Sequence, residues 1–211
     1  MRKWFPAIPI AGAFLLSAAV YSRLPSPMAT HWGINGEPNG YSSRAVGAFL
    51  MPALALVLWA FLRGLPIIDP RRANYARFQG TYDLVVNAVI TLLAAIHVVV
   101  LGTALHWPVP RIDRMAPLGV GALMLLLGNV LPRARPNWWF GIRTPWTLSS
   151  DTVWTRTHRV GGYFMTAAGA IAICSVFLPP AAGFVVFMVA VLGASLASVV
   201  YSYVVWKEEQ P

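Results

Sequence analysis

The fold is decided by residues 160–206, which read VGGYFMTAAGAIAICSVFLPPAAGFVVFMVAVLGASLASVVYSYVVW. This run has 47 residues and contains no Asp, Glu, Lys or Arg. A helix needs about 20 apolar residues to cross the hydrocarbon core of a bilayer, so the run is too long for one crossing. Pro179-Pro180 near its middle cannot continue a helix. The run therefore predicts two transmembrane helices joined by a tight turn.

Four further stretches without these charged residues lie at residues 4–22, 45–62, 84–110 and 115–132. Each is long enough to cross the membrane once. We therefore predict an all-α integral membrane protein with six transmembrane helices. The first stretch has a second interpretation as a signal peptide, because Arg2-Lys3 precedes it and Ser17-Ala18-Ala19 resembles the small residues of a cleavage site. The length of its apolar part favours a transmembrane helix.

Composition supports the membrane assignment. Of the 211 residues, 57% are hydrophobic and 11% are charged, whereas about 25% are charged in a soluble domain. This contrast excludes a soluble enzyme, a disordered tail and a coiled coil. The single cysteine, Cys174, excludes a disulfide framework and a multi-thiolate zinc site, and we expect it to be a small apolar group in lipid. The net charge of +9 is scattered between apolar runs, so we predict no direct nucleic-acid binding.

The basic residues predict the orientation. If the amino terminus is cytoplasmic, the inner segments hold 12 Lys and Arg residues and the outer segments hold 4. Because cytoplasmic loops carry an excess of Lys and Arg, both termini are expected in the cytoplasm. We expect two regions. Residues 1–115 form three helices with a turn-rich outer loop at 23–44, and residues 116–211 form three helices with an inner loop at 133–159.

The outer loop at 23–44 is rich in Gly, Pro and Asn, which predicts a chain of tight turns. His31 and Glu37 have the chemistry of metal ligands, but two ligands without a third are a weak signal. A compact polar cap over the helix ends is the favoured interpretation, and we predict no metal and no cofactor.

The inner loop at 133–159 is aromatic and basic. A short helix is expected to begin near Ser149, and it would place Trp154 and His158 on one face. Two interpretations are balanced. The segment is either a membrane-surface helix that docks by its tryptophans or a partner-binding site. No nucleophile and base pair is evident, so we predict no catalytic residue.

Several polar residues fall within the predicted spans. Asp83 and Asn87 lie one turn apart, and Asn129 lies at a similar depth, so we expect one inner-leaflet polar cluster continuous with Arg143 and His158. Hydrogen bonding between helices is the competing interpretation, and it is favoured for Asn87 and Asn129. His97 lies in the middle of a span, where a neutral, hydrogen-bonded histidine is favoured over a proton relay.

Two motifs resemble known families. Residues 128–162, which read GNVLPRARPNWWFGIRTPWTLSSDTVWTRTHRVGG, resemble the signature of the SdpI family of bacterial membrane proteins. The outer loop is similar to the domain of unknown function that precedes this signature in many members. The similarity of the outer loop rests on Leu24-Pro25, His31, Gly36-Glu37-Pro38 and Gly40-Tyr41.

The resemblance implies a multi-pass protein of the bacterial cytoplasmic membrane that acts by binding and is not an enzyme. It implies immunity to a secreted antimicrobial toxin peptide outside and recruitment of a small transcriptional repressor inside. The residues expected to serve these partners are Asn129, Asn137, Arg143, Thr144, Pro145, Trp146, Trp154, His158 and Arg159 inside, and His31, Gly36, Glu37, Gly40 and Tyr41 outside.

Two alternatives stay open from the sequence. The first is a transporter, or an intramembrane or lipid-handling enzyme, that uses Asp83, Asn129, Arg143 and His158 around a polar cavity. The second is an accessory membrane subunit in which the tryptophans serve only as anchors in the lipid bilayer.

Overall fold

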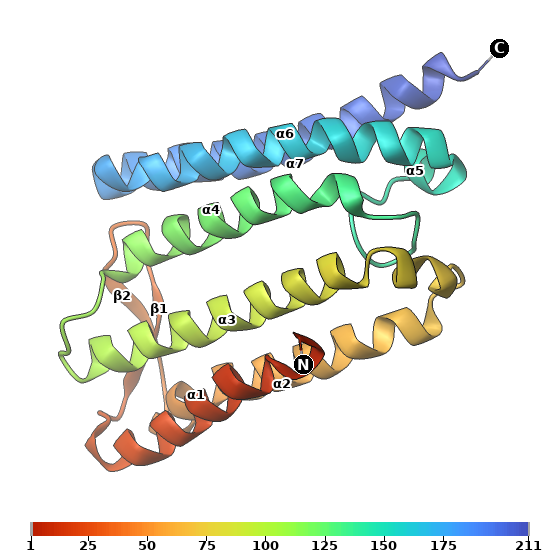
Figure 1. Ribbon diagram of the computed structural model, residues 1–211. Helices are drawn as coiled ribbons and strands as arrows, with labels where there is room; N and C mark the ends of the chain where they lie inside the picture. Colours follow the sequence, from red (N-terminus) through yellow and green to blue (C-terminus); the bar gives the residue numbers. More distant parts are fainter. Residues whose placement is uncertain (1, 211) are drawn as a thin grey trace.

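The computed structural model describes residues 2–210 as a bundle of long helices with one small β-hairpin (Figure 1). The helices are α1 (Ala7–Val20), α2 (Arg44–Ile68), α3 (Gln79–Ala104), α4 (Ile112–Val130), α5 (Pro145–Ser149), α6 (Asp151–Cys174) and α7 (Pro180–Glu208). The strands are β1 (Met28–Trp32) and β2 (Pro38–Ser42). Short 3₁₀ turns are η1 (Arg2–Trp4), η2 (Tyr21–Arg23), η3 (Arg72–Arg77), η4 (Leu131–Arg133) and η5 (Ser175–Phe177).

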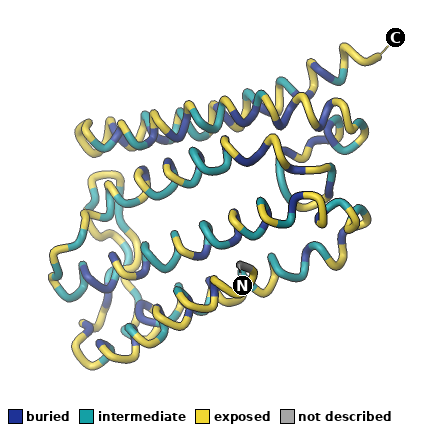
Figure 2. Tube along the Cα trace, viewed as in Figure 1, coloured by how far each residue is buried: buried dark blue, intermediate teal, exposed yellow. Residues whose placement is uncertain are grey.

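Five of the described helices are long and apolar enough to cross a membrane, and the apolar helix at Ala7–Arg23 is shorter. The yellow segments along the helices are exposed (Figure 2), and many large apolar side chains are among the exposed residues. Leu15 is 71% exposed and Val189 is 66% exposed, as expected of side chains that face lipid. The chain is therefore a helical membrane protein, and a sixth crossing through α1 stays a prediction.

The long helices have two common ends. The end that carries β1, β2, the segment 105–111 and η5 is called the hairpin end. The end that carries η3, the segment 131–150 and the carboxyl terminus is called the loop end (Figure 1). The predicted break at Pro179-Pro180 is confirmed, because α6 ends at Cys174, η5 follows it and α7 begins at Pro180.

The prediction of an all-α chain with only turns at 23–44 is wrong for the hairpin. β1 and β2 are antiparallel, with Met28 opposite Ser42 and Ala29 opposite Tyr41. Met28 is fully buried among the helices and lies against Gly47 of α2. This anchor gives one face of a short strand a core to pack on, which the turn-rich composition does not reveal. Gly36 at the tip has φ +77°, a conformation that favours glycine.

The predicted start of a helix near Ser149 also needs correction. Thr144 caps the short α5 in a capping box with Thr147. Ser150, not Ser149, caps α6 by accepting a hydrogen bond from the Val153 N–H at 3.2 Å. No Pro interrupts the chain between Asp151 and Cys174, so the expected surface helix is the first part of a membrane-spanning helix.

Helices α4 and α6 approach closely through glycine. A Cβ atom on Gly162 would lie 2.7 Å from the Gly128 carbonyl oxygen, and one on Gly169 would lie 2.7 Å from the Gly121 carbonyl oxygen. Small residues at such contacts let helix backbones pack without a hydrophobic driving force in lipid. The glycines therefore allow close packing of α4 against α6.

Candidate functional site

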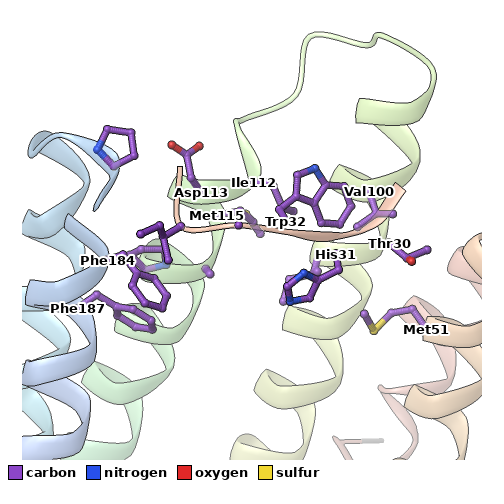
Figure 3. Close-up of a pocket in the computed structure, with 16 residues that line it drawn as sticks. Thr30, His31, Trp32, Met51, Val100, Ile112, Asp113, Met115, Phe184 and Phe187 are labelled. Carbon is purple, nitrogen blue, oxygen red and sulfur yellow. The ribbon is translucent and has the colours of Figure 1, made fainter. Parts of the chain in front are cut away.

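A cavity of about 300 Å³ lies under the hairpin, at the hairpin end of the bundle (Figure 3). Strand β1 forms its roof with His31 and Trp32, while Phe184 and Phe187 of α7 close one side (Figure 3). The other lining residues are mostly apolar and come from the hairpin turn and the ends of the helices: Thr30, Gly33, Ile34, Met51, Ile96, Val100, Ile112, Asp113, Met115, Ala116, Pro117 and Pro180. An apolar cavity with a few polar groups at its rim is typical of a ligand pocket.

The hairpin is tied to α4 across this cavity. Both oxygens of Asp113 accept hydrogen bonds from Arg111, at 3.1 Å from Nε and 3.2 Å from Nη2. Arg111 Nη2 also donates to the Asn35 carbonyl at 3.4 Å, and a Cβ atom on Gly36 would contact the Asp113 side chain. The hairpin that covers the cavity is therefore held against the start of α4.

The structure gathers some of the predicted outer-loop residues. His31 and Glu37 both line a shallow hollow on the hairpin, and His31 Nδ1 is hydrogen-bonded to Asn39 Oδ1 at 2.5 Å. Gly40 pairs with His31 in the sheet, and Tyr41 is exposed on β2. Within residues 2–210, no group of three His, Cys, Asp or Glu side chains is arranged to hold a metal ion.

The loop end is built around Asn137, which is 1% exposed. Its side-chain oxygen accepts from the backbone N–H groups of Trp139 at 2.9 Å and Phe140 at 2.7 Å. Its amide nitrogen donates to the carbonyls of Arg135 at 2.8 Å and Phe140 at 3.0 Å. Asn137 therefore fixes the fold of this loop and is not available to a partner.

Asp69 is a site residue that the sequence reasoning missed. It is 2% exposed, and its Oδ2 accepts from the Trp138 N–H at 2.9 Å and the Tyr75 hydroxyl at 3.1 Å. Its Oδ1 accepts from the Arg71 N–H at 2.7 Å. Burial, and then the charge of Asp69, raises the pKa of the Tyr75 hydroxyl far above its ordinary value, so the hydroxyl remains a donor. The signal in the sequence is an acidic residue directly before Pro70, where an apolar helix ends.

His158 joins α6 to the same loop. Its Nε2 accepts from the Ile142 N–H at 3.0 Å, so the ring proton is on Nδ1, which donates to the Trp154 carbonyl at 2.8 Å. Gly141 has φ +111°, and a Cβ atom there would collide with His158 Nε2. Both ring nitrogens are hydrogen-bonded to backbone groups, so His158 has a structural role in connecting α6 to this loop.

The tryptophans of the loop divide into two kinds. Trp154 is 1% exposed, stacks on His158 with centroids 4.0 Å apart, and donates from Nε1 to the Ala134 carbonyl at 3.0 Å. Membrane docking by Trp154 is therefore wrong, because its ring is inside the protein. Trp146 packs on Tyr203 of α7. Trp138 and Trp139 are the exposed ones.

The remaining predicted residues of the loop differ in accessibility. The Thr144 hydroxyl is buried and hydrogen-bonded to Ser202 of α7 at 3.0 Å. Pro145 opens α5 and is exposed, as are Arg143 and Arg159. Arg143 Nη1 donates to the Trp138 carbonyl at 3.3 Å, which leaves an exposed surface of arginine and tryptophan over a buried polar framework.

The structure does not bring the expected inner-leaflet cluster together. Asp83 accepts from Gln79 at 2.8 Å and lies 3.7 Å from Arg63. Asn129 is exposed and donates to the Leu125 carbonyl of its own helix at 2.7 Å, and Asn87 lines a groove between α3 and α4. These three residues share a depth but point in different directions from their helices. These three residues therefore do not form the cluster that was expected with Arg143 and His158.

The expected hydrogen bond of His97 is confirmed. The Ser17 hydroxyl donates to the Ala48 carbonyl at 2.6 Å, so it accepts from His97 Nε2 at 2.7 Å. This chain of contacts ties α1, α2 and α3 together in the middle of the bundle.

Comparisons with known proteins match two separate parts of the chain. Residues 8–56, which include the hairpin, match a domain of unknown function, DUF1648. Residues 133–202, which include most of the segment 131–150 at the loop end, match the SdpI/YfhL protein family. The chain is also similar to a protein of Bacillus subtilis (strain 168) named Immunity protein SdpI, at 28% identity over 196 residues that cover 93% of this chain and 91% of the relative. No solved structure matches the chain significantly. The chain therefore carries an SdpI/YfhL family region at residues 133–202, with a DUF1648 domain at residues 8–56 on its amino-terminal side.

Proposed function

We propose that this protein protects a bacterial cell from a secreted antimicrobial toxin peptide by binding the peptide at the hairpin end. The name of the Bacillus subtilis relative, Immunity protein SdpI, supports immunity as the biological role. The protein acts by binding in the cytoplasmic membrane and performs no chemistry on the peptide.

The observation that carries the proposal is the apolar cavity under the hairpin. Its volume of about 300 Å³ is at the lower end of the range for ligand pockets, so it suits one or two large apolar side chains of a peptide. Phe184 and Phe187 provide an aromatic wall, while His31 and Asp113 lie at the rim for polar contacts. An amphipathic peptide offers the matching pair of faces, one apolar and one polar.

The orientation is part of the proposal. The hairpin end has Arg23, Arg44, Arg111 and Arg114, whereas most of the other basic residues lie at the loop end or near the amino terminus. The excess of Lys and Arg in cytoplasmic segments favours a hairpin end that faces outward. A secreted peptide would then meet the cavity without crossing the membrane.

A second part of the proposal concerns the loop end. Its exposed Arg143, Arg159, Trp138 and Trp139 form a surface suited to a cytosolic partner such as a small transcriptional repressor. Asn137, Thr144, Trp154 and His158 are buried, so they shape this surface and do not contact the partner. Signalling would require two states of the protein that the peptide binds with different affinity.

A killing assay tests the immunity proposal. Cells that express the protein should survive a cognate toxin peptide, and Phe184→Ala should reduce survival because it removes part of the cavity wall. Phe177→Ala is the matched control, since Phe177 is 86% exposed at the same end and does not line the cavity. Arg143→Ala should weaken survival at unchanged membrane abundance if the loop end takes part.

Two outcomes would contradict the proposal. Killing that equals that of cells without the protein, across a panel of secreted amphipathic peptides, would remove the immunity role. Equal survival of the Phe184→Ala and wild-type cells at equal membrane abundance would remove the cavity as the site.

A further inference from the structure

A second hollow lies in the membrane-spanning part of the protein, away from the cavity under the hairpin. It is a groove of about 540 Å³ between α3 and α4. Its walls include Leu84, Asn87 and Ala95 of α3 and Gly119, Ala122 and Leu126 of α4. The small residues Ala88, Ala95, Gly119 and Ala122 leave space between the two helices unfilled.

The dimensions of the groove decide what can fill it. From Leu84 to Ala95 the helix rises roughly 16 Å, which is about the depth of one leaflet of a 30 Å hydrocarbon core. Even the whole empty space of about 1000 Å³, spread over this length, gives a cross-section of roughly 60 Å², whereas a helix about 10 Å wide has a cross-section of about 80 Å². The groove is therefore too narrow for a peptide helix and suits a single extended acyl chain.

The charges at the loop end of the groove indicate the headgroup. Arg77 directly precedes the Phe78 that caps α3, and Arg133 ends the 3₁₀ turn that follows α4, so one arginine belongs to each wall. Both arginines are exposed, and neither is in an ion pair with another residue of the described range 2–210. The nearest acidic residue on α3, Asp83, is engaged by Gln79 and Arg63. Arg77 and Arg133 therefore place positive charge at the loop end of the two helices, seven residues before Leu84 and seven residues after Leu126.

We propose that the groove binds one anionic glycerophospholipid, with an acyl chain between α3 and α4 and the phosphate between Arg77 and Arg133. The planar guanidinium group forms bidentate hydrogen bonds with phosphate, which suits it to this role. The lipid would fill the space between the first three helices and the last three. This inference does not depend on toxin binding at the hairpin end.

Native mass spectrometry tests the proposal on the full chain. The protein is incorporated into nanodiscs of phosphatidylglycerol and phosphatidylethanolamine in equal amounts, and the lipid that stays bound after release is counted. The wild-type protein should retain one phosphatidylglycerol in preference to phosphatidylethanolamine. Arg77→Ala with Arg133→Ala should reduce this preference by at least about tenfold, because one lost charge-assisted hydrogen bond already costs about tenfold and two arginines are removed.

Filling the groove provides the second variant. Ala122→Trp should remove the retained lipid of both kinds, whereas Ala170→Trp should not, because Ala170 is exposed on α6 and does not line the groove. Equal retention of the two lipids by the wild-type protein, or an unchanged lipid count in Ala122→Trp, would overturn the proposal. If Ala122→Trp fails to fold, the arginine pair decides the question alone.

A photo-reactive diazirine analogue of leucine at position 126, which keeps the size of the Leu126 side chain that lines the groove, separates a lipid from a peptide occupant. Irradiation should give adducts with the mass of phosphatidylglycerol, and many fewer from the same group at position 170. Adducts with an added amphipathic peptide in place of lipid would contradict the lipid assignment.

Discussion

Asp69→Ala is expected to destabilise the loop end, because Asp69 is the buried acceptor that joins the end of α2 to the segment 131–150. The substitution removes the acceptor of the Trp138 N–H at 2.9 Å and of the Arg71 N–H at 2.7 Å. Tyr75 loses one of its two acceptors but keeps Asn137 at 3.3 Å.

The magnitude follows from how many donors are left without a partner. A buried donor that loses its acceptor costs about 1–3 kcal/mol, and the Arg71 N–H lies where water can replace the carboxylate. With the Trp138 N–H as the main loss and a weaker loss at Tyr75, we expect a destabilisation of about 2–4 kcal/mol. For a chain of this size that corresponds to a fall in Tm of roughly 5–15 °C.

The assay is thermal unfolding of the detergent-solubilised full chain, followed by the loss of its monomer peak in size-exclusion chromatography. The matched control is Asp151→Ala, which removes an exposed ion pair with Arg71 at the same end, worth about 0–1 kcal/mol. If the Tm values of Asp69→Ala and Asp151→Ala differ by less than roughly 2 °C, this prediction is refuted.

Three further predictions use the same assay. Gly141→Ala should destabilise the protein by about 1–3 kcal/mol, because a φ of +111° is strained for alanine and the added Cβ atom would collide with His158. Gly64→Ala is the control and should be neutral or slightly stabilising, because there is open space around Gly64. Equal effects of the two substitutions would contradict this prediction. Ser17→Ala should destabilise by about 1–3 kcal/mol because it leaves the His97 Nε2–H without its acceptor, and Ser195→Ala, whose hydroxyl is exposed on α7, should not. Because the pKa of Tyr75 is raised in the folded protein, the unfolded chain loses this proton first as the pH rises above about 10. The free energy of unfolding should therefore fall there by up to about 1.4 kcal/mol per pH unit. A Tyr75→Phe protein with the same slope at alkaline pH would exclude the effect.

The membrane helices could be predicted from the sequence because the bilayer imposes a simple rule. A backbone in lipid must satisfy its own hydrogen bonds, so each crossing is a long apolar helix that is visible in the chain. Pro179-Pro180 marked the boundary between α6 and α7 for a similarly local reason. The exception is α1, whose apolar run reaches 19 residues in the sequence but forms a shorter α-helix of 14 residues.

The site was harder to predict because depth in the membrane does not fix the direction in which a side chain points. Asp83, Asn87 and Asn129 have similar depths but different surroundings. Asp83 contacts Gln79 and Arg63, Asn87 lines the groove between α3 and α4, and Asn129 lies on the exposed side of α4. Asp69 and the hairpin depend on contacts between distant segments, such as Asp69 with Trp138. Such contacts leave no local pattern in the sequence.

The most direct test of the account is labelling of a cysteine in the hairpin in intact cells, in a Cys174→Ala background. A membrane-impermeant maleimide should label Ile34→Cys, because Ile34 is 50% exposed and lines the cavity that we propose faces outward, and a protective toxin peptide should slow this reaction. Arg143→Cys should react only after the membrane is opened. Labelling of Arg143→Cys but not Ile34→Cys in intact cells would contradict the account.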